Sequence, residues 1–228
     1  MIKTVIFDVD NTLYSYTKAH EAAFGELLVY AKRELGLDRE AFAALHQKTE
    51  KELRAYMGDV AALHNRCIRY QIMLESRGLP LHPHVLKMND IYWETLLKAA
   101  VPSPNAEETI KGLKERGVRI GIGTDMTARV QFQKLEALGL LSLMDFLVSS
   151  EETGAEKPKA AFFDRCVEKA GCERRECLFV GDNLKKDVQG AVDAGLQAVW
   201  YRPEEEKDRA DVPRITDLAE LLQKVLAP

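Results

Sequence analysis

Several features common in other protein classes are missing from this sequence, and each absence narrows what the chain can be. Cysteines are few and form no C-x-x-C pair, and a chain of 228 residues can bury a core large enough to need no disulfide framework. Internal repeats and low-complexity tracts are absent as well. With 46% hydrophobic residues, the composition predicts a globular chain rather than a disordered one. We expect reduced core thiols at Cys67, Cys166, Cys172 and Cys177.

The chain also lacks a basic stripe and a long uncharged run. Its 32 Lys and Arg residues face 36 Asp and Glu residues, for a net charge of -4, so a nucleic-acid polymer is not an expected partner. No uncharged run approaches the ~20 residues of a membrane span. Asp8 and Asp10 interrupt the apolar stretch near the N-terminus, which excludes a signal-peptide core. These absences predict a cytoplasmic protein with no membrane partner, and they leave its oligomeric state open.

What the sequence does contain is an alternation of short apolar runs with helical patterns. Alternation of this kind indicates βαβ units and predicts an α/β fold with a Rossmann-like core, in which a parallel sheet carries helices on both faces. The apolar runs that we expect to be strands are Thr4–Phe7, Val118–Gly123, Phe146–Val148, Leu178–Val180 and Ala198–Tyr201. The helices that we expect between and after them are Ala106–Arg116, Ala128–Leu138, Pro158–Ala170, Lys185–Ala194 and Asp217–Leu226.

The segment 15–99 follows a different pattern. Its apolar residues fall at helical spacing, as in Phe24, Leu27 and Ala31, and it contains no strand-like run. Two prolines between positions 101 and 105 favour an extended linker over a continued helix. We therefore predict an inserted, all-helical cap of about four helices at 15–99, and an α/β catalytic core formed by 1–14 and 100–228.

Acidic residues gather where the predicted strands end. Asp8 and Asp10 follow the first strand, Thr124 and Asp125 end the second, and Asp182 follows the fourth. Ligands of an open parallel sheet bind at the carboxyl ends of its strands. Crowded carboxylates repel one another unless a cation lies among them, and hard oxygen ligands with a phosphate nearby suit Mg²⁺. The sequence therefore predicts a magnesium site at this edge of the sheet.

Asp8 and Asp10 leave the first strand with the same side-chain direction, because one residue separates them. Two carboxylates that face one reaction centre permit two roles, an ionised nucleophile and a group that exchanges a proton with the leaving oxygen. The D-x-D pair is weak evidence by itself, since acidic residues after a strand are often turn formers. Its weight comes from the residues on the other strands.

Thr124 and Lys157 supply groups that an anion needs. Thr124 offers a hydroxyl, and the turn into the helix near Ala128 offers backbone N–H groups, which together form a phosphate cradle or an ordinary helix cap. Lys157 precedes Pro158, which we expect to open a helix, so its ammonium group lies beside the positive end of a helix dipole. Taken alone, a lysine is more often a solvated surface residue.

The stretch from Gly181 to Asp187 contains two further carboxylates. Asp182 lies at the end of the fourth strand and Asp187 lies near the start of the following helix. Helix capping is an alternative role for Asp187, but not for Asp182.

These residues, in this order, resemble the four motifs of the haloacid dehalogenase-like hydrolase superfamily. Four spaced motifs on alternating strands, with a helical cap inserted after the first, are far more specific than any single motif. The resemblance covers nearly the whole chain. The matching residues are the run Asp8-Val9-Asp10-Asn11-Thr12, then Thr124, Lys157, and Gly181-Asp182 through Asp187.

The resemblance implies a phosphatase that works through a phosphoaspartyl intermediate. Asp8 would attack phosphorus, and Asp10 would protonate the leaving group and later activate water. Thr124 and Lys157 would hold the phosphoryl group, in keeping with the need of phosphoryl transfer for positioning and charge neutralisation. The implied Mg²⁺ ligands are Asp8, the backbone carbonyl of Asp10, and Asp182. Asp187 would support these ligands without binding the ion directly.

Asp10 also bears on which reaction is expected. Dehalogenases of this superfamily resemble the chain in cap and length but typically lack an acidic residue at this position. An alkoxide leaving group benefits from a general acid, whereas a halide needs no proton, so Asp10 favours a phosphatase. A phosphomutase would need the same four motifs and stays open. The run Asp10-Asn11-Thr12-Leu13-Tyr14 is similar to a nucleotidase-like branch, which makes a nucleoside monophosphate the leading substrate among small phosphorylated metabolites.

Other residues near the motifs allow more than one interpretation. Asp125 departs from the asparagine often found after the second-motif threonine, and its charge near the expected phosphate leaves it outside the catalytic set. Tyr14 and Tyr16 follow the first motif and would either stack on a substrate ring or pack the cap against the core. None of the five histidines is predicted to be a ligand; they are His20, His46, His64, His82 and His84.

The sequence allows two other classes of protein as alternatives to the hydrolase. Gly121-Ile122-Gly123 could begin a dinucleotide-binding loop, but the third glycine of that fingerprint would fall at Met126. A catalytically silent binding protein is the other alternative, and the presence of both Asp8 and Asp10 argues against it.

Overall fold

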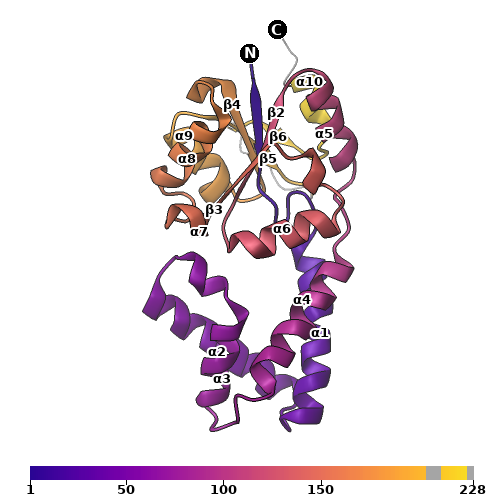
Figure 1. Cartoon of the computed structure of the whole chain (residues 1–228), viewed down its shortest axis with the longest axis vertical. Helices are drawn as coiled ribbons and strands as arrows, with labels where there is room; N and C mark the ends of the chain where they lie inside the picture. Colours follow the sequence, from indigo (N-terminus) through magenta and orange to yellow (C-terminus); the bar gives the residue numbers. More distant parts are fainter. Residues whose placement is uncertain (204–211, 225–228) are drawn as a thin grey trace. The chain divides into compact units, whose positions relative to one another are not determined.

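The computed structural model describes residues 1–203 and 212–224. The chain divides into two compact units, one formed by Met1–Ser15 with Val101–Pro228 and the other by Tyr16–Ala100. The first unit contains the β-sheet and the second is built from helices (Figure 1). No helix of the described part is long and apolar enough to cross a membrane.

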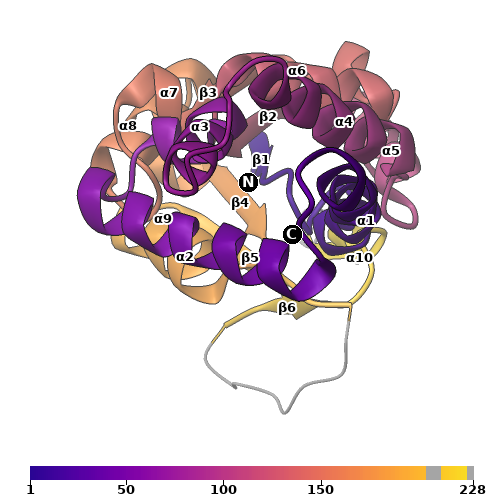
Figure 2. The same ribbon diagram turned by 90° about the horizontal axis from the view of Figure 1, so that it is seen from below.

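A sheet of six parallel strands forms the centre of the first unit, as far as the described residues show. The strand order is β3-β2-β1-β4-β5-β6, and β4, β5 and β6 follow one another across one half of the sheet (Figure 2). This arrangement confirms the predicted Rossmann-like core. The strands are β1 (Thr4–Phe7), β2 (Arg119–Thr124), β3 (Phe146–Ser149), β4 (Cys177–Gly181), β5 (Gln197–Tyr201) and β6 (Arg214–Ile215).

The strands read as continuous apolar runs because helices cover both faces of the sheet. All four residues of β1 and all five of β4 are buried. β6 was not predicted, since two residues are too short to show a pattern. The helical segments of this unit are α5 (Ala106–Glu115), α6 (Ala128–Ala137), η2 (Leu141–Leu143), α7 (Ser150–Thr153), α8 (Ala160–Ala170), η3 (Arg174–Glu176), η4 (Leu184–Gln189), α9 (Gly190–Asp193) and α10 (Glu220–Lys224).

Helices α5 and α10 pack together on one face of the sheet, and α8 and α9 pack together on the other (Figure 1). Gly112 of α5 lies so close to Leu222 of α10 that a Cβ there would stand 3.0 Å from the leucine side chain. On the opposite face, Phe163 of α8 lies against Gly190 of α9. Close packing of this kind fixes the helices, and therefore the loops that they carry, on the sheet.

Two predicted helix starts are wrong in detail. Pro158 does not open a helix, because the amide of Lys159 donates to the carbonyl of Glu156 at 3.0 Å in a separate turn, and α8 begins only at Ala160. Asn105 precedes α5 without a side-chain capping bond. Its amide instead donates to the carboxylate of Asp217 at 2.8 and 3.0 Å.

The helix expected at 185–194 is present in a modified form. The segment η4 is a π-helix, in which the amide of Val188 donates to the carbonyl of Asn183 five residues earlier, at 3.3 Å. It leads directly into α9. Single π-helical turns occur often at functional sites. At the C-terminus, α10 covers 220–224 of the expected 217–226, and residues 225 and 226 lie outside the described residues.

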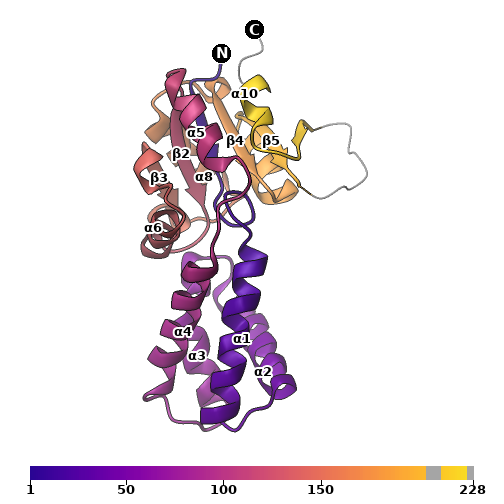
Figure 3. The ribbon, with the colours of Figure 1, turned by 90° about the vertical axis from the view of Figure 1, so that its right-hand side faces the viewer.

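The second unit consists of α1 (Tyr16–Glu34), α2 (Arg39–Met57), the short η1 (Ala61–His64), α3 (Arg66–Glu75) and α4 (His84–Ala99). Helices α1 and α4 run side by side (Figure 3). Asp38 caps α2 by accepting from the Ala41 amide at 2.8 Å, and Asn65 caps α3 by accepting from the Cys67 amide at 2.9 Å. Such caps satisfy amides that the first turn of a helix leaves unpaired.

The four cysteines are free thiols, as expected. Cys166 and Cys177 are buried, whereas Cys67 and Cys172 are only partly buried. The expectation of core thiols therefore holds for two of the four positions.

Candidate active site

Three neighbouring strands bring the predicted site residues to one edge of the sheet. β1 lies between β2 and β4, and its last residue, Phe7, is in register with Ile122 and Val180. The amide of Asp8 donates to the Val180 carbonyl at 2.9 Å, so the backbone of Asp8 is still held by the sheet. Because the strands are parallel, the residues that follow all three emerge at the same edge.

Lys157 is a buried cation that joins two of the acids. Its Nζ lies 2.7 Å from Asp8 Oδ1 and 2.7 Å from Asp187 Oδ1, and it donates to the Gly123 carbonyl at 3.3 Å. The residue is only 4% exposed. Burial alone would lower the pKa of Lys157, but the charges of Asp187 and Asp8 outweigh it and raise that pKa well above its ordinary value. The sequence alternative of a solvated surface lysine is therefore wrong.

Asp8, Asp182 and Asp187 form a tight acidic cluster. Each offers a carboxylate oxygen, and the three oxygens lie within 4.8 Å of one another. Asp182 is held through its backbone, because its carbonyl accepts from Trp200 Nε1 at 2.7 Å. Gly181 makes room for the cluster, since a Cβ at this position would collide with the carboxylate of Asp187. Such a cluster could hold a metal ion.

The electrostatics of this cluster show how crowded it is. Burial, followed by the charge of Asp187, raises the pKa of Asp182 to about 6. Burial also raises the pKa of Asp8 well above its usual range, and the charges of Asp187 and Asp182 act in the same direction against the opposing charge of Lys157. A cation placed among these carboxylates would relieve the repulsion.

Asp10 lies beside these acids, but its carboxylate points to other partners. Lys134 Nζ donates to both oxygens of Asp10, at 2.7 and 2.8 Å. The Tyr14 hydroxyl donates to Oδ1 at 2.6 Å, and the Gln131 amide donates to Oδ2 at 3.2 Å. Burial would raise the pKa of Asp10, but the Lys134 charge together with the hydrogen bonds from Lys134, Tyr14 and Gln131 outweighs burial and lowers that pKa. The carboxylate is thus ionised and fixed in direction.

Sequence reasoning missed Lys134 and Gln131. Both lie on α6, three positions apart, and both are fully buried. The signal was available: Leu135 and Leu138 mark the buried face of this helix, and two polar residues interrupt that face where apolar ones would be expected.

Thr124 is in place but part of its predicted cradle is already engaged. Its hydroxyl accepts from the Gln131 amide at 2.8 Å and donates to the Asp125 carbonyl at 3.3 Å. In the turn that follows, the amide of Met126 donates to Ser150 Oγ at 2.8 Å and that of Ala128 donates to Glu151 at 2.9 Å. The start of α6 therefore presents fewer free donors than the sequence predicted.

Asp125 holds the neighbouring loop rather than the reaction centre. Its Oδ1 accepts from the backbone amide of Lys157 at 3.0 Å, and its Oδ2 accepts from Lys186 Nζ at 2.9 Å. Lys186 also donates to Glu156 at 3.2 Å. These contacts agree with leaving Asp125 out of the catalytic set, and they show that it fixes the backbone from which Lys157 extends.

The two tyrosines after the first motif have separate roles. Tyr14 is fully buried and bonded to Asp10, so its ring is not exposed to stack on a ligand. Tyr16 begins α1 in the helical unit, where its hydroxyl lies 3.1 Å from that of Tyr92 and accepts from Arg66 at 3.0 Å.

The dinucleotide alternative does not fit the structure. Gly121 and Gly123 lie inside β2 rather than in a loop after it. A Cβ at Gly121 would clash with the ring of Phe146, and one at Gly123 would stand 2.7 Å from Phe179. These glycines permit close packing around the strand and form no phosphate-binding turn.

An α/β enzyme with its reaction centre at the carboxyl edge of a parallel sheet is the class that this fold and site define. A family model described as haloacid dehalogenase-like hydrolase matches residues 2–195. The chain therefore belongs to the haloacid dehalogenase-like hydrolases, which confirms the resemblance seen in its four motifs.

Curated relatives cover most of the chain. A ribulose-1,5-bisphosphate 5-phosphatase of Halopiger xanaduensis is 37% identical, over 92% of this chain and 89% of the relative. A glyceraldehyde 3-phosphate phosphatase of Methanopyrus kandleri is 31% identical, over 93% of this chain and 91% of the relative. A pyrimidine 5'-nucleotidase of Escherichia coli is 32% identical over 60% of this chain and 62% of the relative.

Solved structures share the fold. A phosphatase of this superfamily from Thermococcus onnurineus superposes with a TM-score of 0.76 at 24% identity, and the match covers 99% of this chain and 98% of the other. A 2-haloacid dehalogenase from Pseudomonas syringae gives the same TM-score and identity over the full length of both chains. At this level of identity the fold is common to phosphatases and dehalogenases, so the fold does not choose between them.

Proposed function

We propose that this chain is a Mg²⁺-dependent phosphatase that hydrolyses a small phosphorylated metabolite through a phosphoaspartyl intermediate on Asp8. The observation that carries the proposal is the contact of Lys157 Nζ with Asp8 Oδ1 at 2.7 Å, inside a cluster of three carboxylates. A buried nucleophile, a buried cation and a cation-binding cluster at one point are what phosphoryl transfer requires. The relatives named as phosphatases support the same reaction.

The residues present fit a divalent cation. Asp8, Asp182 and Asp187 converge within 4.8 Å, and burial, followed by the charge of Asp187, raises the pKa of Asp182 to about 6. Hard carboxylate oxygens suit Mg²⁺. We propose Asp8, Asp182 and the backbone carbonyl of Asp10 as its ligands, with Asp187 either supporting or joining them. When bound, the ion would neutralise charge on the phosphoryl oxygens.

The transfer step uses the chain's own side chains. A carboxylate oxygen of Asp8 forms a bond to phosphorus while the bond from phosphorus to the leaving oxygen breaks, and Asp10 gives that oxygen a proton. Lys157 and the Thr124 hydroxyl hold the phosphoryl oxygens. In the second step water attacks phosphorus, the aspartyl bond breaks, and Asp10 takes the proton from the water.

Asp10 is ionised in this structure, so its acid role requires that it take up a proton from solvent when the substrate binds. Burial would raise the pKa of Asp10, but the Lys134 charge and the hydrogen bonds to the carboxylate together lower it. A phosphate dianion placed beside Asp10 would raise that pKa again, since like charges favour the protonated form. Before the substrate binds, the ion pair with Lys134 fixes the direction of the Asp10 carboxylate.

Two classes of metabolite are candidates for the substrate, nucleoside monophosphates and sugar phosphates. The motif favours a nucleoside monophosphate, and one relative is named a pyrimidine 5'-nucleotidase. The relatives named for ribulose bisphosphate and glyceraldehyde phosphate make sugar phosphates a necessary part of any test.

The test is phosphate release from nucleotides, sugar monophosphates, sugar bisphosphates and small organic phosphates, with Mg²⁺ or with EDTA. Wild type is compared with Asp8→Asn and with Asp193→Asn, an exposed aspartate on α9. We expect Mg²⁺-dependent release that disappears only in Asp8→Asn. Release that persists in Asp8→Asn would exclude the aspartyl nucleophile, and no release from any compound would favour a mutase, a dehalogenase or a non-catalytic binding protein.

A further inference from the structure

The helical unit contains two buried guanidinium groups. Arg66 and Arg69 lie three positions apart on α3, on one side of the helix, and they are 6% and 4% exposed. Burial and the positive charge of Arg66 together lower the pKa of Arg69, so the two charges act on one another. Like charges in a poorly solvated position are costly unless a counter-ion lies between them.

Protein carboxylates compensate only one of these charges. Arg69 Nη1 lies 3.3 Å from Glu50 Oε2, and the Glu50 side chain is 40% exposed. Arg66 instead donates Nη2 to the hydroxyls of Tyr16 and Tyr92, at 3.0 and 2.9 Å, with its guanidinium carbon 4.5 Å from the centre of the Tyr92 ring. Among residues 1–203 and 212–224, Arg66 has no acidic partner.

Hydrogen-bonding capacity is unused here as well as charge. The Nε atoms of Arg66 and Arg69 are buried without an acceptor. Natural proteins rarely leave such donors unsatisfied. Because Nε is enclosed, an arriving anion would be bound through the Nη atoms.

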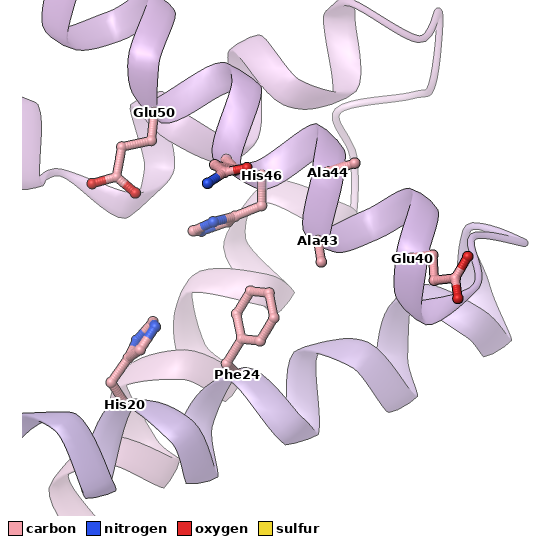
Figure 4. A pocket seen from close by; sticks show the side chains of 8 residues that line it. His20, Phe24, Glu40, Ala43, Ala44, His46 and Glu50 are labelled. Atoms are coloured by element: carbon pink, nitrogen blue, oxygen red, sulfur yellow. The ribbon is translucent and has the colours of Figure 1, made fainter.

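A pocket of about 620 Å³ opens between α1 and α2. His20, Phe24, His46 and Glu50 converge on it (Figure 4). His46 is 6% exposed and its Nε2 has no partner. Two residues of the lining connect the pocket to the arginines, which do not line it themselves. Glu50 pairs with Arg69, and His20 Nδ1 lies 2.8 Å from the Tyr92 hydroxyl that accepts from Arg66.

The charges of the arginines extend into this pocket. Burial, followed by the charges of Arg69 and Arg66, lowers the pKa of His46 to about 3. Burial and then Arg66 lower the pKa of His20 in the same way. Both rings are therefore neutral at pH 7. The other acid of the lining, Glu40, lies ten positions before Glu50 on α2, about 15 Å along the helix axis. Its carboxylate is therefore far from the end of the pocket that Glu50 lines.

We propose that the helical unit binds an oxyanion, the phosphate or carboxylate group of a small metabolite, at Arg66 and Arg69, with the rest of that metabolite in the adjoining pocket. Guanidinium groups match the planar arrangement of donors that both kinds of oxyanion accept. Phe24 and the neutral rings of His20 and His46 would contact an uncharged, hydroxyl-bearing remainder.

The histidines make binding observable without any enzymatic reaction. All five histidines of the chain lie between positions 20 and 84, inside the helical unit. The experiment follows the histidine ring signals of the full chain by NMR during titration with inorganic phosphate, acetate, a sugar monophosphate and a sugar bisphosphate. The variants are Arg66→Gln, Arg69→Gln and the charge-conserving Arg66→Lys, and the exposed His82 is the internal control.

We expect saturable shifts at His20 and His46, no shift at His82, loss of the response in both Gln variants, and partial retention in Arg66→Lys. Equal responses to phosphate and the bisphosphate would identify a free-anion site, and a response to the bisphosphate alone would identify a second charged group of the metabolite. No shift with any probe, or equal shifts in wild type and the Gln variants, would overturn the proposal.

Turnover provides a second, separable measurement, and this arm rests on the proposed phosphatase activity. If the bound group belongs to a substrate, kcat/KM for a bisphosphate should fall at least about tenfold in Arg66→Gln relative to kcat/KM for a monophosphate. Histidine shifts without turnover of any compound would count against the phosphatase and leave the anion site intact. Turnover without histidine shifts would count against the anion site alone.

Discussion

The two units of this chain carry opposite charge imbalances. At the sheet edge, the carboxylates of Asp8, Asp182 and Asp187 lie close together, and the ammonium group of Lys157 pairs with two of them, Asp8 and Asp187. In the helical unit, two guanidinium groups are buried, and of these only Arg69 pairs with a carboxylate, that of Glu50, among the described residues. A chain selected for stability alone would remove both imbalances. According to the two proposals above, a ligand completes each of them, a cation in the first case and an anion in the second.

The comparison also separates fixed groups from adaptable ones. Asp10 is held from three sides by Lys134, Tyr14 and Gln131, so it is oriented before any substrate arrives. Arg66 binds the hydroxyls of Tyr16 and Tyr92 and, among the described residues, no carboxylate. The first arrangement is suited to chemistry, which needs fixed geometry. The second is suited to binding, where a ligand completes a set of contacts that is still open.

The largest expected effect comes from removing the nucleophile. Asp8→Asn keeps the shape of the side chain but cannot form the aspartyl intermediate, so we expect phosphate release to fall by at least about 10⁴-fold. The folded chain should remain, because the substitution reduces the repulsion with Asp182 and Asp187. Phosphate release with parallel thermal melting checks both statements. A variant that loses activity only because it unfolds would leave the role of Asp8 unsupported.

The next effect sharpens the helical side of the comparison. His46 has a pKa of about 3 because it is buried near two arginines, far below its value of ~6.5 in an unfolded chain. A group whose folded pKa is depressed binds its proton first in the unfolded state, so stability is complete above about pH 6.5 and is lost as pH falls toward 3. The loss is up to ~1.4 kcal/mol for each pH unit.

Denaturant titrations between about pH 7 and 4 measure this slope in wild type, in His46→Gln and in a control, His82→Gln, whose histidine is exposed. We expect a flatter acid limb in His46→Gln only. Identical limbs in all three chains would mean that other groups control the acid sensitivity of this unit.

Lys134 tests the fixed geometry of the core. Lys134→Met removes the fully buried partner of Asp10, and breaking a buried ion pair costs ~3–5 kcal/mol. Because the Asp10 side chain is 28% exposed, we expect a smaller loss than this range, about 2 kcal/mol. We also expect kcat to fall by about 10-fold to 100-fold, since Asp10 loses its direction.

The matched control for this change is Arg129→Met, which removes an exposed cation from the same helix. A double-mutant cycle with Asp10→Asn separates the pair from general effects of each substitution. Full additivity in kcat would show that Lys134 affects turnover independently of Asp10.

The sheet and its motifs could be predicted from the sequence, whereas the buried cations and their partners could not. The strands, their parallel arrangement and the family follow from apolar runs that end in short motifs, because such motifs depend on a few adjacent residues. Lys134 lies 124 positions from its partner Asp10, and no local pattern links the two. The buried arginines of α3 escaped notice for a similar reason: helical spacing shows which face a residue occupies, whereas the absence of a partner is a property of the folded unit.

Local detail at helix ends was the least predictable part of the core. Pro158 suggested a helix start, but the turn closed by Lys159 and Glu156 delays α8 to Ala160. Asn105 occupies a capping position without capping, since Asp217 competes for its side chain. In both places a contact distant in sequence or a competing turn overrode a sound local preference.

The smallest expected effect concerns Asp125, whose charge adds to the excess of acid at the sheet edge. Its Oδ1 accepts from the Lys157 amide at 3.0 Å, and its Oδ2 pairs with Lys186, which is 33% exposed. Asp125→Asn keeps the first contact and loses a partly screened ion pair, so we expect about 0.5 kcal/mol of lost stability and less than about threefold change in kcat/KM. Asp125→Ala loses both contacts and leaves the amide of Lys157 unpaired, for which we expect about 1–2 kcal/mol of lost stability and a roughly tenfold change in kcat/KM.

Melting curves and phosphate release for the two variants decide between the roles of the Asp125 charge and of its hydrogen bond to the Lys157 amide. If Asn and Ala behave alike, the charge of Asp125 matters more than its bond to the Lys157 backbone, and its negative charge would then belong to the same functional excess as the three acids beside it.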